Sequence, residues 1–206
     1  TIQHFAEKAL REGVIKTRGE RGTAVVMHAK TGAVLAMANY PGYDPNRYQF
    51  FSREHQLNYA VTAGYEPGST FKMITVAAGL NEGLISADQE FFCEEGVYKI
   101  GSNLIRDSSP QGVLTLQQIL KKSSNICAAK IGMSIPPSRF YDYIKLFGFG
   151  QKPNSGIAAE ASGRVISHKK WKSIDHATIS FGQAILVSPL QMVSAANVFA
   201  NQGKWV

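Results

Sequence analysis

The sequence predicts a mixed fold in which several helices accompany an antiparallel β-hairpin. Three observations carry this prediction. Apolar residues recur with helical spacing in residues 3–15 and 188–203. Residues 23–38 contain two β-rich apolar runs around a short Lys-Thr-Gly turn. Residues 69–80 are apolar on nearly all sides, which is typical of a helix buried in a protein core.

The N-terminal half supplies the first helix, the hairpin and the buried helix. Phe5, Ala9, Leu10 and Val14 predict an amphipathic helix over residues 3–15. The hairpin at residues 23–38 is followed by NYPGYDPNRY, a loop of turn dipeptides. The remaining predictions are the buried helix at 69–80 and a loop-rich stretch at 81–112, with a short hairpin near 91–100.

The C-terminal half is predicted to be mainly helical. LTLQQILKKSSNICAAKIGMSI, residues 114–135, predicts a helix, a break near Ser123 and a second helix. The other predicted elements are a helix at 138–147, a loop at 150–175 and a helix at 188–203 that a glycine closes.

Composition excludes several broad classes of protein. The 206 residues can form one sizeable core, and 44% hydrophobic with 18% charged residues is ordinary for a globular protein. The net charge is +7, but the basic residues are scattered and accompany no zinc spacing or RNA-binding signature, so no nucleic-acid partner is predicted. No apolar run approaches the roughly 18 to 20 residues of a membrane span. Cys93 and Cys127 match no metal or redox motif, and a disulfide between them is left open.

The first candidate for chemistry is a serine followed three residues later by a lysine at the start of the buried helix. Ser69 and Lys72 lie on the same helix face, so the hydroxyl and the amine are expected within reach of each other. Burial disfavours the charged amine, and a neutral lysine beside a hydroxyl is a base beside a nucleophile. The same residues also fit an N-cap serine followed by a lysine whose amine reaches the surface.

Spacing alone does not establish this site, because the chain contains the same spacing twice. Ser167 and Lys170 repeat it in the polar, basic run SHKKWKS, with no apolar helix behind them. A Ser-x-x-Lys is expected roughly once by chance in a chain of this length. The second copy is therefore predicted to be solvated surface.

The second candidate is Ser123-Ser124-Asn125, the only Ser-x-Asn in the chain. At a helix junction, Ser123 can relay a proton, and the carboxamide of Asn125 can hold a substrate amide as donor and acceptor. The alternative is that Ser123 or Ser124 only caps the helix that begins after them.

The two motifs and the sequence around them resemble the transpeptidase domain of class B (monofunctional) penicillin-binding proteins, of the division and elongation type. The resemblance covers nearly the whole chain in order. The segments that carry it are AVVMHAKTGAVLAMANYPGYDPN, LNYAVTAGYEPGSTFK, GVLTLQQILKKSSNICAAKIG, FGFG, EASG and SFGQAILVSPLQMVSAANVFANQG.

The resemblance implies a reaction and a role for each candidate residue. Ser69 would attack the carbonyl before the terminal D-Ala of a peptidoglycan stem peptide, and neutral Lys72 would take its proton. Ser123 would return a proton to the leaving amine, and Asn125 would hold the substrate and contact Lys72. The backbone N–H of Ser69 would form half of an oxyanion hole. β-Lactam antibiotics would acylate the same serine, and no metal or organic cofactor is implied.

The resemblance also implies an α+β fold of the penicillin-binding protein and serine β-lactamase type, with helices flanking an antiparallel sheet of about five strands. That family has a Lys-Thr-Gly motif after Ser-x-Asn, whereas Lys30-Thr31-Gly32 precedes Ser69 and is read as an ordinary turn. Residues 1–206 are therefore expected to be a single transpeptidase domain that lacks its C-terminal strands and an N-terminal membrane anchor. The expected location is the periplasmic face of the bacterial inner membrane, with other cell-wall synthesis proteins as partners.

Two other functions stay open at the level of sequence. A serine β-lactamase or β-lactam sensor of related fold would differ by its faster deacylation. A non-catalytic cell-wall scaffold would keep the fold without turnover. A Ser-His-Asp hydrolase is not indicated, because Gly-x-Ser-x-Gly is absent and Asp175-His176 is expected at the surface.

Overall fold

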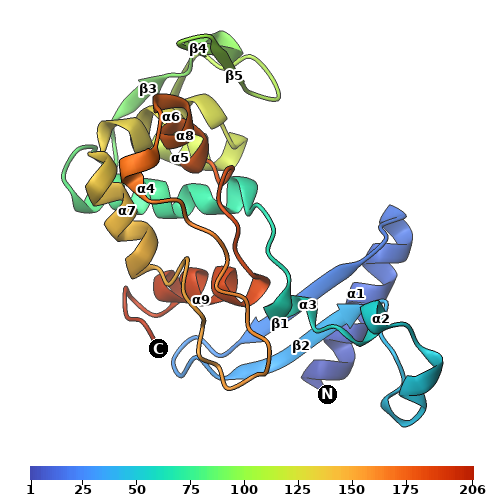
Figure 1. Cartoon of the computed structure of the whole chain (residues 1–206). Coiled ribbons are helices and arrows are strands. Elements are labelled where there is room, and N and C mark those ends of the chain that lie inside the picture. Colours follow the sequence, from blue (N-terminus) through green and yellow to red (C-terminus); the bar gives the residue numbers. More distant parts are fainter. The chain divides into compact units, whose positions relative to one another are not determined.

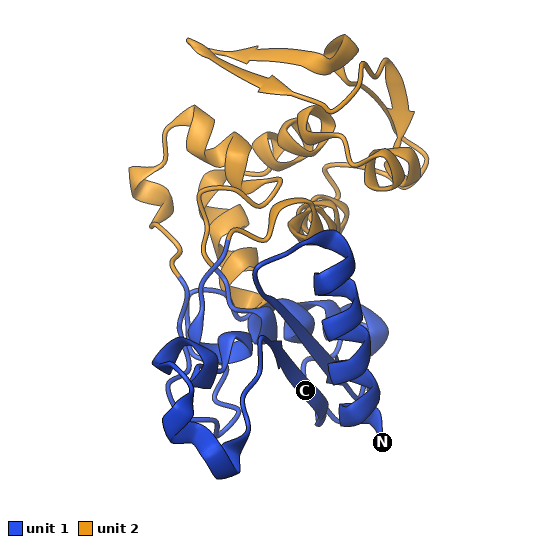
Figure 2. Cartoon of the chain, turned by 90° about the vertical axis from the view of Figure 1, so that its right-hand side faces the viewer, with its two compact units in different colours: residues 1–65, 148–163, 187–206 blue, residues 66–147, 164–186 orange.

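The computed structural model describes all 206 residues, and Figure 1 labels the α-helices and most of the strands in chain order. The chain forms two compact units, coloured separately in Figure 2. Unit 1 comprises residues 1–65, 148–163 and 187–206, and unit 2 comprises residues 66–147 and 164–186. Helices and three two-stranded antiparallel sheets occur together, in agreement with the predicted α+β class.

Unit 1 is built on the predicted hairpin. Strands β1 (Gly22–Met27) and β2 (Val34–Tyr40) pair antiparallel, with a change of register between Val26 and Met27. Lys30-Thr31-Gly32 lies in the connecting turn, where the N–H groups of Thr31 and Gly32 both donate to the carbonyl of His28. Gly32 has a φ of 69°, a conformation that favours glycine. The prediction that this Lys-Thr-Gly occupies a hairpin turn is confirmed.

Helix α1 (Ile2–Thr17) packs against β1 and β2, as its amphipathic pattern indicates. The packed face differs in part from the predicted one. Leu10 and Val14 lie on it, whereas Phe5 is 69% exposed and Ala9 is also exposed. The helix has no acidic residue in its first turn, and Arg18 ends it in the left-handed conformation.

The rest of unit 1 consists of short helices and one longer one. Helix α9 (Pro189–Ala200) packs against β1, and the buried side chain of Gln191 donates to the carbonyls of Gln151 and Ser162. Gly203, whose N–H donates to the carbonyl of Val198, closes this helix as predicted. The elements are η1 (Pro45–Phe50), α2 (Arg53–Gln56), α3 (Tyr59–Thr62) and α9 (Pro189–Ala200).

Unit 2 is organised around one helix that is mostly buried. Helix α6 (Asn125–Ser134) packs against α4 (Lys72–Asn81) and α8 (Ser173–Ile179), and its residues belong to two apolar clusters. Gly132 permits the approach to α8, because a Cβ there would collide with Ser180. The remaining helices are η2 (Gly68–Phe71), α5 (Leu116–Lys122), α7 (Pro137–Leu146) and η4 (His168–Lys170).

The strands of unit 2 pair differently from the prediction. The expected hairpin near residues 91–100 is wrong, because η3 (Glu94–Gly96) separates the two strands and Gly96 turns the chain with a φ of 87°. Instead, β3 (Glu90–Phe92) pairs with β6 (Val113–Thr115), and β4 (Val97–Ile100) pairs with β5 (Asn103–Arg106).

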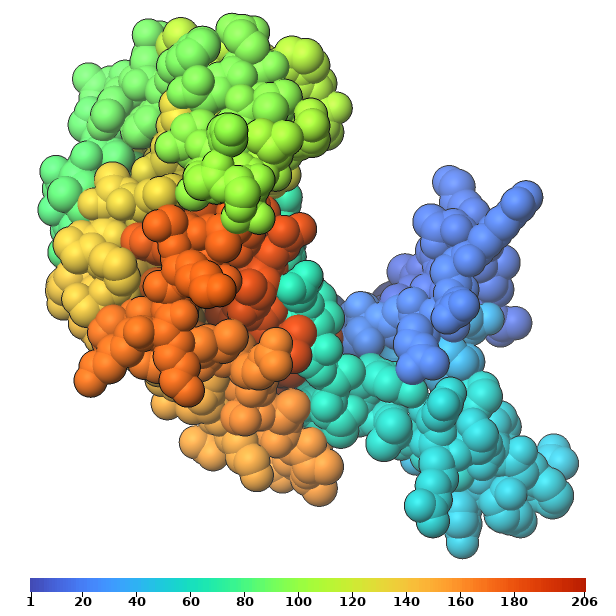
Figure 3. Space-filling model, turned by 45° about the horizontal axis from the view of Figure 1, so that its top comes forward, coloured from blue at the N-terminus to red at the C-terminus, as the bar shows by residue number.

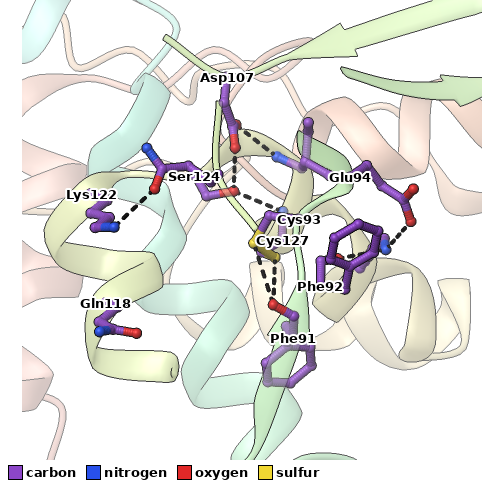
Figure 4. Close-up of a disulfide and its surroundings, with 12 residues drawn as sticks. Phe91, Phe92, Cys93, Glu94, Asp107, Gln118, Lys122, Ser124 and Cys127 are labelled. Atoms are coloured by element: carbon purple, nitrogen blue, oxygen red, sulfur yellow. Dashed lines mark hydrogen bonds and ion pairs between the residues drawn. A yellow bond between two sulfur atoms is a disulfide. The ribbon is translucent and has the colours of Figure 1, made fainter. Parts of the chain in front are cut away.

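A disulfide joins Cys93, which comes directly after β3, to Cys127 in the first turn of α6. The Cα atoms are 5.2 Å apart, and 34 positions separate the two residues in sequence. Figure 4 shows the bridge beside the carbonyl of Phe91 and below Ser124. Closing a loop of this length stabilises a fold by about 4 kcal/mol in the chain-entropy treatment. The disulfide between Cys93 and Cys127, which the sequence left open, is present because the fold brings the two residues together.

Two further expectations need correction. The stretch at 150–175, predicted as loop, contains η4 and the start of α8. His176 is buried against Trp171 and Phe140 instead of lying at the surface, and burial lowers its pKa. Asp175 is half-buried and caps α8 by accepting from the N–H of Lys172. None of the helices has both the length and the apolar character that a bilayer span requires.

Candidate active site

Ser69 lies in the 3-10 turn η2, immediately before α4. Its side chain is exposed, and its carbonyl accepts from the N–H of Lys72, so the turn runs directly into the helix. The N–H of Gly68 donates to the carbonyl of Gly182 at 2.9 Å. A Cβ at Gly182 would collide with the backbone of Gly68, so glycine is required there for the segment that carries Ser69 to sit in place.

Lys72 is almost completely buried, with 1% of its surface exposed. Its Nζ lies 3.0 Å from Ser69 Oγ, 2.8 Å from Ser123 Oγ and 2.6 Å from the carbonyl oxygen of Ser123. A fourth contact, at 2.8 Å, reaches Oδ1 of Asn125. An ammonium has three N–H donors, so the four oxygen atoms around Nζ outnumber its donors by one. The alternative prediction, in which the amine of Lys72 reaches the surface, is therefore wrong.

The surroundings of Lys72 lower its pKa from 10.5 to about 8. Burial is the main cause, because it disfavours the charged amine, and the negative charge of Asp107 acts in the opposite direction. At pH 7 roughly a tenth of such an amine is neutral, a few hundred times the fraction of an ordinary lysine. Lys72 therefore has the properties of a base that works near neutral pH.

Ser123 and Asn125 come from the predicted break between α5 and α6. Ser123 ends α5 with φ 58° and ψ 43°, the left-handed conformation that seldom occurs outside glycine. Ser124 is the N-cap of α6 and accepts from the N–H of Cys127, so Ser124 performs the capping that was the alternative role of this motif. The hydroxyl of Ser123 instead donates to Ser69 Oγ at 2.8 Å.

The side-chain amide of Asn125 is held at both ends. Its oxygen accepts from Lys72, and its Nδ2 donates to the carbonyl of Arg106 at 3.0 Å. Asn125 also borders a pocket of about 380 Å³ between β5 and α8. Figure 3 shows the surface on which these two segments, coloured green and orange-red, lie side by side. Space for another molecule thus adjoins the motif.

The four predicted residues form one hydrogen-bonded group within unit 2, although Ser69 and Ser123 are 54 positions apart. An exposed hydroxyl contacts both a buried amine and a second hydroxyl. This arrangement can remove a proton from Ser69 and pass one to a group that binds above it. The catalytic roles of the four side chains stay predictions.

Sequence reasoning missed two residues that position this group, Gly182 and Asp107. Asp107 accepts hydrogen bonds from Ser124 and from two backbone N–H groups of α6. No local pattern marked either residue, because the contacts that matter join segments far apart in sequence. A glycine followed by a polar residue in SFGQ indicates only a turn.

A buried lysine between two serines and an asparagine, at the start of an apolar helix in an α+β fold, is the arrangement expected of the serine acyl-transfer class that carries Ser-x-x-Lys and Ser-x-Asn motifs. The family comparison agrees with this class. Residues 22–206 match the model of the penicillin binding protein transpeptidase domain. The chain belongs to this family.

The curated relatives are peptidoglycan transpeptidases by name. The chain is 34% identical over 205 residues to the probable peptidoglycan D,D-transpeptidase PbpC of Pseudomonas aeruginosa, covering 100% of this chain and 36% of that protein. Identity to the peptidoglycan D,D-transpeptidase FtsI of Escherichia coli is 34% over 204 residues, covering 99% and 34%. The chain thus spans about a third of the length of these two relatives.

Solved structures of related proteins share the fold. A peptidoglycan glycosyltransferase from Burkholderia ambifaria superposes with a TM-score of 0.88 at 32% identity, covering 98% of this chain and 60% of that one. The apo structure of the TP domain of Burkholderia pseudomallei penicillin-binding protein 3 gives the same TM-score and identity, covering 98% and 56%. The predicted penicillin-binding protein fold is confirmed.

Proposed function

We propose that this protein is a peptidoglycan D,D-transpeptidase that cross-links stem peptides through a serine acyl-enzyme and is acylated by β-lactams. The observation that carries the proposal is the contact of buried Lys72 with Ser69, Ser123 and Asn125. Membership of the transpeptidase family and the names of the relatives support the same activity.

Acylation begins with neutral Lys72 and the 3.0 Å contact to Ser69. Ser69 Oγ forms a bond to the carbonyl carbon before the terminal D-Ala, while its proton passes to Lys72 Nζ. The carbonyl becomes an oxyanion, which the N–H of Ser69 helps to stabilise. Asn125 holds the backbone of the bound peptide with its amide.

Collapse of this intermediate breaks the bond to the terminal D-Ala. The departing amine needs a proton, and Ser123 relays it from Lys72, whose Nζ lies 2.8 Å from the Ser123 hydroxyl. An ester on Ser69 remains. The amine of a neighbouring stem peptide then attacks the ester, loses a proton to the same relay and forms the cross-link, which frees Ser69.

A β-lactam undergoes the first step alone. Its ring amide opens when Ser69 attacks, but the amine stays attached to the acyl group, so no leaving group departs. A transpeptidase then holds the adduct for hours, whereas a β-lactamase, the second candidate, releases it much faster. A non-catalytic scaffold would form no adduct.

The cellular setting is part of the same proposal. Residues 1–206 form part of a single transpeptidase domain that acts at the extracytoplasmic face of the bacterial inner membrane, in the periplasm. Its substrates are peptidoglycan stem peptides, and other cell-wall synthesis proteins are its partners. Membrane attachment is assigned to an anchor outside residues 1–206.

The proposal is tested by treating the full-length protein with a penicillin and measuring its intact mass. We expect one covalent adduct, which peptide mapping places within residues 66–72 and which persists for hours. Ser69→Ala should form none, whereas the matched control Ser167→Ala should react like the parent. An adduct on Ser123 or Ser167 would contradict the assignment, and rapid release would favour a β-lactamase.

A further inference from the structure

Asp107 comes directly after β5, and its carboxylate is directed at the first turn of α6, as Figure 4 shows. Oδ2 accepts from the hydroxyl of Ser124 at 2.6 Å. Oδ1 accepts from the N–H groups of Asn125 at 2.6 Å and of Ile126 at 3.1 Å. Because the first N–H groups of a helix have no partner within it, this carboxylate satisfies donors that burial would otherwise leave unpaired.

The contacts continue from Asp107 to the catalytic group. The neighbouring Arg106 accepts from the side chain of Asn125 through its carbonyl, so two consecutive residues hold both the backbone and the amide of Asn125. Rotating Asn125 away from Lys72 would break these bonds. We propose that Asp107 is a positioning residue of the active site, which holds the first turn of α6 so that Asn125 and Ser123 face Lys72.

Asp107 itself has little freedom to move. Its N–H donates to the carbonyl of Gly96, and the N–H of Gly96 donates to the carbonyl of Cys93. Cys93 is joined to Cys127 in the same turn of α6 that Asp107 binds. A closed set of covalent and hydrogen bonds therefore surrounds the helix start, which keeps the carboxylate at the distance that its donors need.

The charge of Asp107 gives the residue a second effect on the site. Its negative charge raises the pKa of Lys72, although burial lowers that pKa by more. Of the other charged groups on the helices packed against α4, Lys130 pairs with Glu94, Lys122 donates to Gln111, and Lys121 is exposed. At the far end of α4, Arg139 of α7 pairs with Glu82. Asp107 is the one charged group whose interaction shifts the pKa of Lys72.

This inference rests on the proposed function, but its first test does not need activity. The side chain of Lys72, labelled with ¹³C, is titrated by NMR in the parent and in Asp107→Asn. Asparagine keeps the shape and one acceptor oxygen but removes the charge. We expect the midpoint of Lys72 to fall by at least about 0.3 pH units, which is a twofold change in its neutral fraction. The control is Asp88→Asn, an exposed carboxylate that also accepts from a serine hydroxyl and should leave the midpoint unchanged.

The second test measures β-lactam acylation rate against pH in the full-length protein. In Asp107→Asn, the pH range over which the acylation rate rises should move to lower pH, by the same interval as the NMR midpoint of Lys72. Asp107→Ala, which also removes the acceptors, should lower the rate tenfold or more at every pH. If the alanine variant does not fold, the asparagine variant still decides the question.

The outcomes separate the inference from the proposed function. Suppose that the parent is acylated, that Asp107→Asn leaves the titration midpoint of Lys72 unchanged, and that both Asp107 variants are acylated at rates within twofold of the parental rate. Asp107 is then not a positioning residue. If the parent forms no adduct, the transpeptidase proposal fails, and the NMR titration alone then judges Asp107. An unchanged Lys72 midpoint in that case overturns the inference as well.

Discussion

The two Ser-x-x-Lys copies in unit 2 form the same local backbone turn. In each copy the N–H of the lysine donates to the carbonyl of the serine, from Lys72 to Ser69 and from Lys170 to Ser167. The side chains nevertheless differ completely. Lys72 is buried with four oxygens around its Nζ, whereas Lys170 is exposed and its amine has no hydrogen-bond or salt-bridge partner.

The difference arises from the segment that each turn leads into. Lys72 begins a ten-residue apolar helix that packs against α6, whereas Lys170 ends the three-residue helix η4. Burial requires an apolar surface to cover the stem of the lysine and polar partners for its amine. The comparison teaches that spacing brings a serine near a lysine, but packing against other helices lowers the pKa of the lysine.

The sharpest test of the comparison replaces each lysine by arginine. Lys72→Arg should lower β-lactam acylation by two or more orders of magnitude, because arginine cannot give up its proton and a lost general base has this scale. Lys170→Arg should stay within a few-fold of the parent. Stopped-flow measurement of adduct formation gives both rates. A folded Lys72→Arg protein that reacts at the parental rate would mean that Lys72 is not the base.

A second test compares stability at alkaline pH. The folded pKa of Lys72, about 8, lies below its unfolded value of 10.5, so the unfolded chain binds more protons between these values. The free energy of unfolding should therefore rise with pH through this window, by about 2 kcal/mol between pH 8 and pH 10. Lys72→Met should lack this gain, and Lys170→Met should keep it. Urea unfolding of the three proteins at both pH values measures this change in the free energy of unfolding. An equal change in all three proteins would contradict a lowered pKa of Lys72 in the folded state.

The pH dependence of acylation is a third test. In the proposed mechanism only neutral Lys72 accepts the proton of Ser69, so the rate should fall about tenfold per pH unit on the acid side of the pKa near 8. The same profile should persist in Lys170→Met. An acylation rate that stays constant between pH 5 and pH 8 would mean that Lys72 is not the general base.

The smallest effect is expected in unit 1, at the turn Lys30-Thr31-Gly32. Lys30 is exposed, and the hydroxyl of Thr31 contacts Nδ1 of His28. Lys30→Ala and Thr31→Ala should each leave the acylation rate within a few-fold, because surface turn substitutions seldom matter more. A hundredfold loss would mean that this turn belongs to the active site.

Local pattern predicted much of the secondary structure and selected the four site residues. Helix α4, the β1–β2 hairpin and the break at Ser123 were all predictable, because the residues that form them are neighbours in sequence. Predictions failed where distant segments decide the outcome. Phe5 of α1 is exposed, β3 pairs with β6 across 20 intervening residues, and His176 is buried among aromatic rings.

The sequence by itself determined which side chains were available for chemistry: a serine and a lysine one turn apart, and a Ser-x-Asn at a helix junction. Only the tertiary structure decided that Ser69 meets Ser123, that Cys93 bonds to Cys127 and that Asp107 holds α6. The physical reason is the range of the interactions. Hydrogen bonds within a helix or turn and side-chain periodicity act over a few residues, whereas burial, which lowers the pKa of Lys72, depends on helices that only the packed core brings together.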